Sequence, residues 1–405
     1  MSAKSPLTRA VDFGASYGNA VVLLFFLFLL TLFGTLEQVE HGLFEVQRKY
    51  FESFFLVADL GEIFDLPFRL PLPLPGAVLV LSLLTLNLLC GGLIRIRKNK
   101  STLGVIIIHV GIVLMFAAGL VKLTASEDGH LTLFETESSD EFVSYYLWEV
   151  AIFDATQRAD VQEHIIPDAA FLDLTGDRAA TFTSPDLPFT VTLSHVAKNC
   201  RPLPKGPMWA ADSPVVEGYA LRAFELEEVA EQNVAGLHVR VDFADGESVE
   251  GLLWGFERSA WTFRTDGRVW GMSLRHKRYK MPFTVVLDDF TRELHPNTGI
   301  PKAFMSDITK REGGSESRLR ISMNEPLRHG GLVLFQSSWG PSNAGPGDPL
   351  FSVFSVVRNP SDHWPAWSCG IIALGMIIAF GQKLYRYIRA QAAARQRLQA
   401  GEAQA

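Results

Sequence analysis

Four long apolar runs constrain this chain more than any other feature of its sequence. They cover residues 20–36, 76–94, 103–121 and 366–381. A helix rises about 1.5 Å per residue, so runs of this length can cross most or all of a hydrocarbon core roughly 30 Å thick. We expect four transmembrane helices. No small-residue cleavage pattern follows the first run, which is therefore interpreted as a retained span and not as a signal peptide.

Composition agrees with residence in a membrane. Hydrophobic residues make up 48% of the 405 residues, and the mean hydropathy is +0.15. A formal net charge of −7 argues against a partner made of nucleic acid, because phosphate neutralisation needs clustered Lys and Arg. An arrangement with three spans and an amphipathic last helix stays open as the alternative.

Basic residues near the ends of the runs predict the orientation of the spans. The loop 95–102 contains RIRKNK, and the tail 382–405 carries five basic side chains. Such flanks resist translocation, so we expect them to be cytoplasmic together with residues 1–19. Four crossings then place 37–75 and 122–365 on the outer side.

The long region between the third and fourth runs changes to an alternation of period two, which is typical of half-buried strands. We expect a large, all-β extracytoplasmic domain over 122–365, most simply a sandwich. A region of this size can bury one core or divide into two lobes, and 202–214 is the expected interruption. The predicted fold class is an α-helical integral membrane protein with four transmembrane helices and a β domain between the third and fourth.

No pattern in the β region indicates catalysis. The sequence lacks G-x-S-x-G, H-E-x-x-H and a Walker loop, and it also lacks C-x-x-C and C-x-x-C-H. Of the three cysteines, only Cys200 lies in a region expected to face water. The histidines of this region show no metal-ligand spacing and are expected to be structural or exposed; they are residues 130, 164, 195, 238, 276, 295, 329 and 363. We expect no catalytic residue in the chain.

His109 is the exception, because it lies within the third apolar run. An ionisable side chain at that depth is costly and is a functional candidate, and a neutral imidazole is a good axial ligand for haem iron. The alternative is a histidine that only hydrogen-bonds a neighbouring helix. Small residues at 104, 111 and 118 form a stripe about 140 to 200° away from it around the helix. We expect the stripe to pack within this chain while His109 faces haem or a partner helix.

Asn87 lies at a depth that matches His109, each roughly 10 Å inside the cytoplasmic boundary. If their helices are neighbours, the Asn87 amide could hold one ring nitrogen of His109 and leave the other for iron. This second hypothesis conflicts with a ring that faces only outward.

Several separate segments resemble the ResB/CcsB family of cytochrome c biogenesis proteins. They include FGTLEQ (33–38), the proline-led second run (72–96), LGVIIIHVGIVLM (103–115) and FTVVLDDF (283–290). The strongest is MNEPLRHGGLVLFQSSWG (323–340), which is similar to the family pattern N-x-P-L-x-x-x-G-x-x-x-x-Q-S. Within this last segment we expect a strand, a turn at Gly330 and Gly331, and a second strand. A docking edge there is the alternative.

The resemblance implies a non-catalytic subunit of a cytochrome c haem lyase complex of System II. By position, the family's intramembrane histidine corresponds to His109. The resemblance therefore implies that His109 is an axial ligand of a transiently bound haem b. The implied partners are a tryptophan-rich CcsA/ResC-type membrane protein, apocytochrome c and a thioredoxin-like thiol reductase, besides membrane lipid. The implied location is the inner (cytoplasmic) membrane, with the large domain on the periplasmic side.

This sequence also lacks two features that occur in the family's machinery. Its eight tryptophans are dispersed, so it carries no tryptophan-rich segment of its own, and FGTLEQ lacks the proline usual at that point. The client cytochrome, and whether haem is transported or only relayed, stay open. A membrane-anchored scaffold or receptor that binds no haem is the rival from another class, and a transporter subunit for another cargo is a third.

Overall fold

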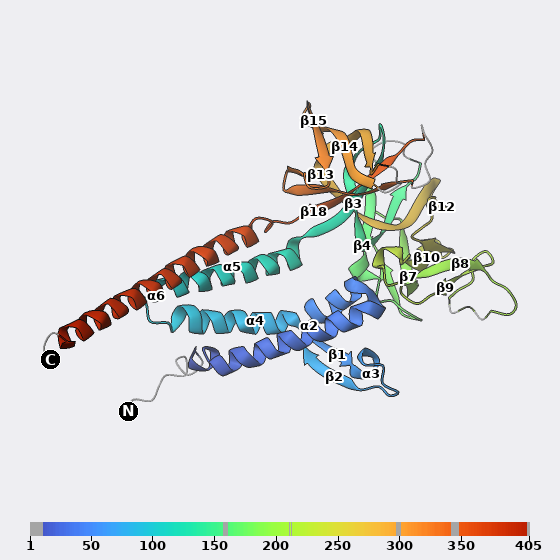
Figure 1. Ribbon diagram of the computed structural model, residues 1–405. Helices are drawn as coiled ribbons and strands as arrows, with labels where there is room; N and C mark the ends of the chain where they lie inside the picture. Colours follow the sequence, from blue (N-terminus) through green and yellow to red (C-terminus); the bar gives the residue numbers. More distant parts are fainter. Residues whose placement is uncertain are drawn as a thin grey trace. The chain divides into compact units, whose positions relative to one another are not determined.

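The computed structural model describes residues 11–156, 161–209, 211, 213–296, 301–341 and 348–402. The chain forms two compact units (Figure 1). The helical unit comprises Met1–Ser126 and Asn359–Ala405, and the β unit comprises Glu127–Arg358.

Among its described residues, the helical unit contains four helices that are long and apolar enough to cross a membrane, as predicted. The first is α2 (Tyr17–Val46), which a π-helical turn extends over Gln47–Phe51. The second is α4 (Ala77–Leu88), likewise extended by a π-helical segment over Leu89–Ile94. The third is α5 (Leu103–Ala125) and the fourth is α6 (Trp364–Glu402). Between α2 and α4 lie β1 (Phe55–Asp59), α3 (Leu60–Ile63) and β2 (Pro71–Pro75).

The α2 helix is interrupted at Gly42, which takes φ 72° and ψ 162°. A left-handed φ of this kind favours glycine. After it the chain turns back, so that Val46, Tyr50 and Phe51 lie against Gly34. The return also neutralises the buried Glu37, whose carboxylate accepts hydrogen bonds from Lys49 Nζ (2.5 Å) and Tyr50 Oη (2.6 Å). The first part of the predicted outer loop is therefore folded onto α2.

The stripe of small residues on α5 packs against α6, which confirms the predicted contact within this chain. A Cβ atom on Gly104 would lie 2.6 Å from the backbone nitrogen of Ala379, and one on Gly111 would lie 2.6 Å from Ile372 Cγ1. At the other end, Ser361 Oγ donates to the carbonyl oxygen of Ala118 (2.9 Å). The two helices thus approach closely because side chains are absent along the contact. The α6 helix continues well past the predicted apolar run 366–381.

The β unit is built almost wholly from antiparallel strands. Their bounds are β3 (Glu127–Phe134), β4 (Ser138–Asp154), β5 (Glu163–Pro167), β6 (Ala179–Phe182), β7 (Phe189–Ala197), β8 (Cys200–Pro204), β9 (Tyr219–Ala223), β10 (Gly236–Phe243), β11 (Ser248–Trp254), β12 (Trp261–Thr265), β13 (Arg268–Leu294), β14 (Pro301–Glu312), β15 (Ser315–Ser322), β16 (Leu327–His329), β17 (Leu332–Gly340) and β18 (Phe351–Arg358). The main path of the larger sheet is β15-β14-β13-β4-β3-β18-β17-β16, and β6, β7, β10 and β11 form a second sheet. The predicted β-rich character is confirmed.

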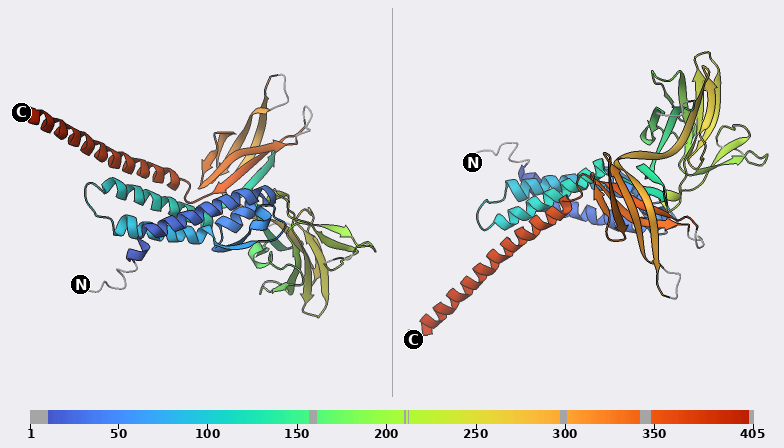
Figure 2. Two further views of the ribbon diagram at one scale, coloured as in Figure 1. Left: turned by 60° about the horizontal axis from the view of Figure 1, so that its bottom comes forward. Right: turned by 90° about the horizontal axis from the view of Figure 1, so that it is seen from above.

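Two hydrophobic cores lie within the described part of this unit, and the long strands β4 and β13 contribute to both. Figure 2 shows the strands of the unit from two further directions. In β13, Trp270, Met272 and Leu274 belong to one core, whereas Phe283 and Val285 belong to the other. The predicted interruption at 202–214 is wrong as a boundary between lobes. That stretch begins in β8 and leads to β9, with which β8 pairs as a two-stranded sheet. Turn residues in the sequence do not show that β4 and β13 are long enough to contribute to both cores.

The segment 323–340 forms the predicted hairpin. Strands β16 and β17 pair from Leu327↔Leu334 to His329↔Leu332, and Gly330 and Gly331 form the turn with φ 57° and 76°. Two successive left-handed residues are the signature of the tight turn that suits strand twist. Gln336 is buried and bonds Ser306 and Ser352, so it is not part of an exposed docking edge.

Candidate functional site

His109 lies in α5 with its imidazole against Gly92 of the second apolar helix. A Cβ atom on Gly92 would be 2.2 Å from His109 Cδ2 and 2.9 Å from Nε2. Such distances are far below van der Waals contact, so only glycine leaves room for the ring at this position. The side chain is half-buried and lies on the side of α5 away from the contact with α6.

Gly92 belongs to the π-helical segment Leu89–Ile94. Such segments are rare and often occur at functional sites, because the extra residue in the turn locally widens the helix. The preceding glycine behaves differently, since a Cβ on Gly91 would make only ordinary contacts with Ala15 at 3.5 Å. The sequence C-G-G thus contains one glycine that the ring requires and one that it does not.

A hydrogen bond to the helix backbone determines the tautomer of His109. Its Nδ1 lies 2.6 Å from the carbonyl oxygen of Val105, one turn earlier. A carbonyl oxygen can only accept, so Nδ1 carries the proton, and in the neutral imidazole the lone pair is on Nε2. Within the described parts of the chain, no group hydrogen-bonds to Nε2. The ring is therefore held by one nitrogen with the other able to bind a metal.

The hypothesis that Asn87 holds the His109 ring is wrong. The Asn87 amide donates instead to the carbonyl oxygens of Gly14 (2.6 Å) and Ser16 (3.0 Å), in the segment that precedes α2. The backbone of α5 itself supplies the partner that Asn87 was expected to provide. Matching depth in two helices does not determine which residues face each other, and here Gly92 faces the ring.

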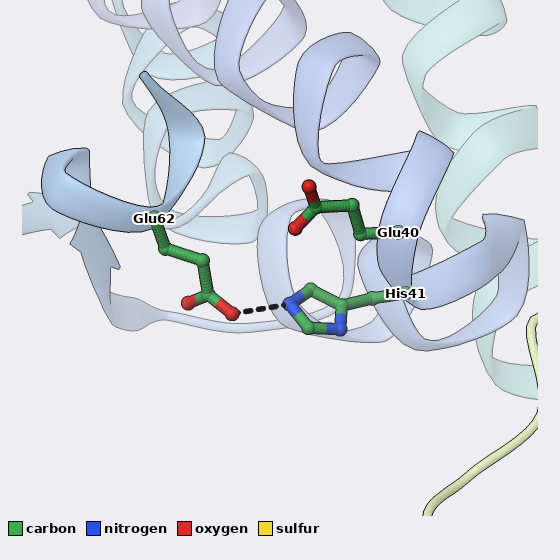
Figure 3. A group of neighbouring side chains, drawn as sticks. All are labelled: Glu40, His41 and Glu62. Atoms are coloured by element: carbon green, nitrogen blue, oxygen red, sulfur yellow. Dashed lines mark hydrogen bonds and ion pairs between the residues drawn. The ribbon is translucent and has the colours of Figure 1, made fainter. Parts of the chain in front are cut away.

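A second group of polar side chains joins α2, just before its interruption at Gly42, to the short helix α3 (Figure 3). Glu40, His41 and Glu62 each offer a ligand atom within 4.8 Å of the others, and His41 Nε2 is 2.9 Å from Glu62 Oε1. All three are exposed. An exposed ion pair between His41 and Glu62 accounts for this contact, which ties α3 to α2. Sequence reasoning overlooked it, because Glu62 comes from a different element at no recognisable spacing.

Histidines of the β unit have structural surroundings. His276 stacks on Trp148 with ring centroids 4.0 Å apart, and His329 Nε2 lies 2.6 Å from Glu312 Oε2. Burial, reinforced by the nearby His130, lowers the pKa of His276 to about 4. Burial likewise lowers the pKa of His130. Both rings are therefore neutral at ordinary pH.

Cys200 lies in the region expected to face water, but its own side chain is buried. Burial raises the pKa of its thiol to about 12, which makes it unreactive. Its neighbour is Gly236, where a Cβ would lie 2.5 Å from the sulfur. The residue therefore fills a tight position in the core.

Four apolar helices together with a large β-rich unit indicate a membrane protein that carries a sizeable β domain. A sequence model of the ResB-like family matches residues 97–348, which is more than half of the chain. The chain belongs to the ResB-like family. The matched residues include His109 and the hairpin segment 323–340, and the family implies a role in cytochrome c biogenesis. None of the curated proteins compared with the chain matches it.

Proposed function

We propose that this protein holds haem at His109 and passes it on for attachment to apocytochrome c. The observation that carries the proposal is the state of the imidazole. Its Nδ1–H is bonded to the Val105 carbonyl, and its Nε2 lone pair has no hydrogen-bond partner in the described chain. A histidine that served only to join helices would use its second nitrogen in a hydrogen bond to a neighbour.

The apolar character of the surroundings of His109 suits haem. Haem has an apolar ring, and the exposed side chain next to His109 on α5 is Val110. Bound iron would take one axial ligand from Nε2, with a second histidine coming from a partner protein. The role of this chain is to orient the imidazole of His109 through Val105 and Gly92, and to shield the haem ring from water.

In this proposal the four helices cross the inner membrane with both termini on the cytoplasmic side, in line with the basic flanks of the apolar runs. The β unit then lies on the periplasmic side. A CcsA/ResC-type partner supplies the tryptophan-rich segment that this chain does not have, and reduced apocytochrome c receives the haem.

The test is the Soret absorbance of protein purified from haem-replete cells, alone and with its partner. We expect haem in the wild type and its loss in His109→Ala. The control is His363→Ala, since His363 is an exposed histidine of the same unit. If neither wild-type preparation holds haem, or if the His109→Ala spectrum equals that of the wild type, the proposal is wrong and the scaffold becomes the better explanation.

A second test uses the paired glycines. In Gly92→Ala the new methyl group would occupy the position of the ring, so we expect the Soret band to weaken severalfold or shift. Gly91→Ala is matched in sequence and residue type, but it meets only ordinary contacts and should keep the spectrum. Equal spectra for the two variants, with both proteins folded by circular dichroism, would show that the position of the His109 ring does not matter.

A further inference from the structure

The β1–β2 hairpin has two apolar faces, which is unusual for a segment expected to lie in water. Its inner face carries Leu56 and Leu74, which are buried. Its outer face carries Phe55 (73% exposed) and Val57 (56% exposed), opposite Pro75 and Pro73. A strand pair with one wet side normally places polar residues there. Here the outer face is apolar along most of its length.

Strand β2 reads PLPLP, with proline at every second position. Proline has no N–H to donate, and in a sheet it is tolerated where the N–H would point away from the partner strand. The prolines alternate with Leu72 and Leu74, which face Ala58 and Leu56. The free edge of β2 therefore exposes no N–H group at positions 71, 73 and 75. In water such groups would be hydrated, whereas in lipid each would be costly.

The hairpin shares a hydrophobic core with the apolar helices. Leu56, Ala58 and Leu74 are in one cluster with Leu30 and Phe33 of α2, and the cluster also contains Ala77, Val80 and Leu84 from the first turns of α4. Figure 1 shows β1, β2 and α3 beside α2. The hairpin therefore packs at the level of the apolar runs, and only the single residue Gly76 separates β2 from α4.

Charged side chains gather at the other end of the hairpin. Asp59 accepts hydrogen bonds from the backbone N–H groups of Gly61 and Leu70, and it lies 3.7 Å from Arg69. Glu62 pairs with His41. Exposed phenylalanines lie among these charges, namely Phe64 (51%) and Phe68 (58%). This gradient, from an apolar end beside α4 to a charged end, matches the gradient from acyl chains to headgroups.

We propose that the outer face of the β1–β2 hairpin inserts into the outer leaflet of the membrane and contacts lipid. Residues 55–75 are then a membrane-embedded anchor and not a water-exposed loop. The segment lies outside the residues that the family model matches. The proposal rests on membrane residence and is independent of haem binding at His109.

Spin labelling of the full chain in vesicles of phosphatidylethanolamine and phosphatidylglycerol tests this. A Cys369→Ser background removes the exposed native thiol, since Cys90 and Cys200 are buried. Labels are placed at Phe55→Cys, at Leu24→Cys as the lipid reference in α2, and at Ser315→Cys as the water reference in the β unit. Collisions with oxygen report apolar surroundings, and collisions with a water-soluble nickel chelate report water.

We expect the label at 55 to resemble that at 24. Its ratio of oxygen collisions to nickel collisions should be severalfold higher than the ratio at 315. A label at Phe68→Cys should be intermediate. If 24 is in lipid but 55 is as open to nickel as 315, the hairpin lies in water and the proposal is overturned. A label at 55 that is shielded from both reagents would show protein covering this face, which also overturns it. Nickel access at 24 would contradict membrane residence itself.

Discussion

The helix contacts of the helical unit and the tight turns of the β unit use glycine in different ways. In the helical unit, Gly92 and Gly104 are contact points, because the atoms of a neighbouring helix occupy the place of a side chain. In the β unit, Gly313 and Gly331 lie at turns with positive φ, and a Cβ atom added to either would have nothing within 4 Å. These helix contacts need glycine for space, whereas these β turns need it for backbone conformation.

Buried charge occurs in both units, since the helical unit buries Glu37 beside Lys49. The β unit buries Glu149 beside Arg275, whose guanidinium also forms a paired contact with Glu163. Around this network lie two cores of large apolar side chains. Helices in lipid gain little from hiding apolar surface, so they associate through close approach. A unit in water gains stability from apolar burial and can also include a buried ion network.

The largest expected effect is on the β unit, from Arg275→Met. The change leaves the buried carboxylate of Glu149 without its cation, which typically costs about 3 to 5 kcal/mol. Tryptophan fluorescence during thermal unfolding measures it, because residues 148, 209, 254, 261, 270 and 339 lie in this unit. The double variant Arg275→Met with Glu149→Met should recover part of the loss. No recovery would mean that packing, and not unpaired charge, caused it.

Acidification should weaken the β unit next most strongly. The pKa of His276 is about 4 in the folded protein and near 6.5 when unfolded, so between these values the unfolded chain binds more protons. Stability is therefore lost as the pH falls from about 6.5 to 4, by up to about 3 kcal/mol. His276→Phe keeps a ring on Trp148 but cannot titrate, so its stability should depend less on pH. An unchanged pH profile in this variant would assign the dependence to other groups.

On the helical side, Gly104→Ala should disturb the contact between α5 and α6. The added methyl group meets backbone atoms of α6, which cannot move as a side chain can, and overpacking of this kind costs about 1 to 3 kcal/mol. The melting of helical circular dichroism in detergent measures the change. Gly119→Ala lies in the same helix with nothing within 4 Å and should melt like the wild type. Similar melting of both variants would contradict the close approach.

The smallest effect is expected for Gly331→Ala in the β16–β17 turn. There is space for the methyl group, but the φ of 76° costs about 1 kcal/mol for any residue with a side chain. Gly206→Ala, also with nothing within 4 Å but without a positive φ, should be neutral or slightly stabilising. Tryptophan fluorescence during thermal unfolding again compares the two variants. A loss of stability confined to Gly206→Ala would contradict the expected cost of the positive φ at Gly331.

Much of the fold follows from local pattern. Four apolar runs predicted four helices, and the Gly330–Gly331 pair predicted the hairpin that forms there, because both features depend on neighbouring residues. The boundary between the two β cores was mispredicted. It depends on how far β4 and β13 continue, and the alternation of side chains does not mark where a strand passes from one core to another.

The candidate site divides in the same way. Sequence alone selected His109, since an imidazole in an apolar run is costly, and it predicted that the small residues 104, 111 and 118 meet another part of the chain. The second hypothesis, that Asn87 holds the imidazole, is wrong, because Asn87 instead bonds the segment before α2. Hydropathy specifies which segments leave water. It does not specify the rotation of each helix about its axis, which packing decides. That rotation places Gly92 against the ring and leaves Nε2 without a hydrogen bond from the described residues.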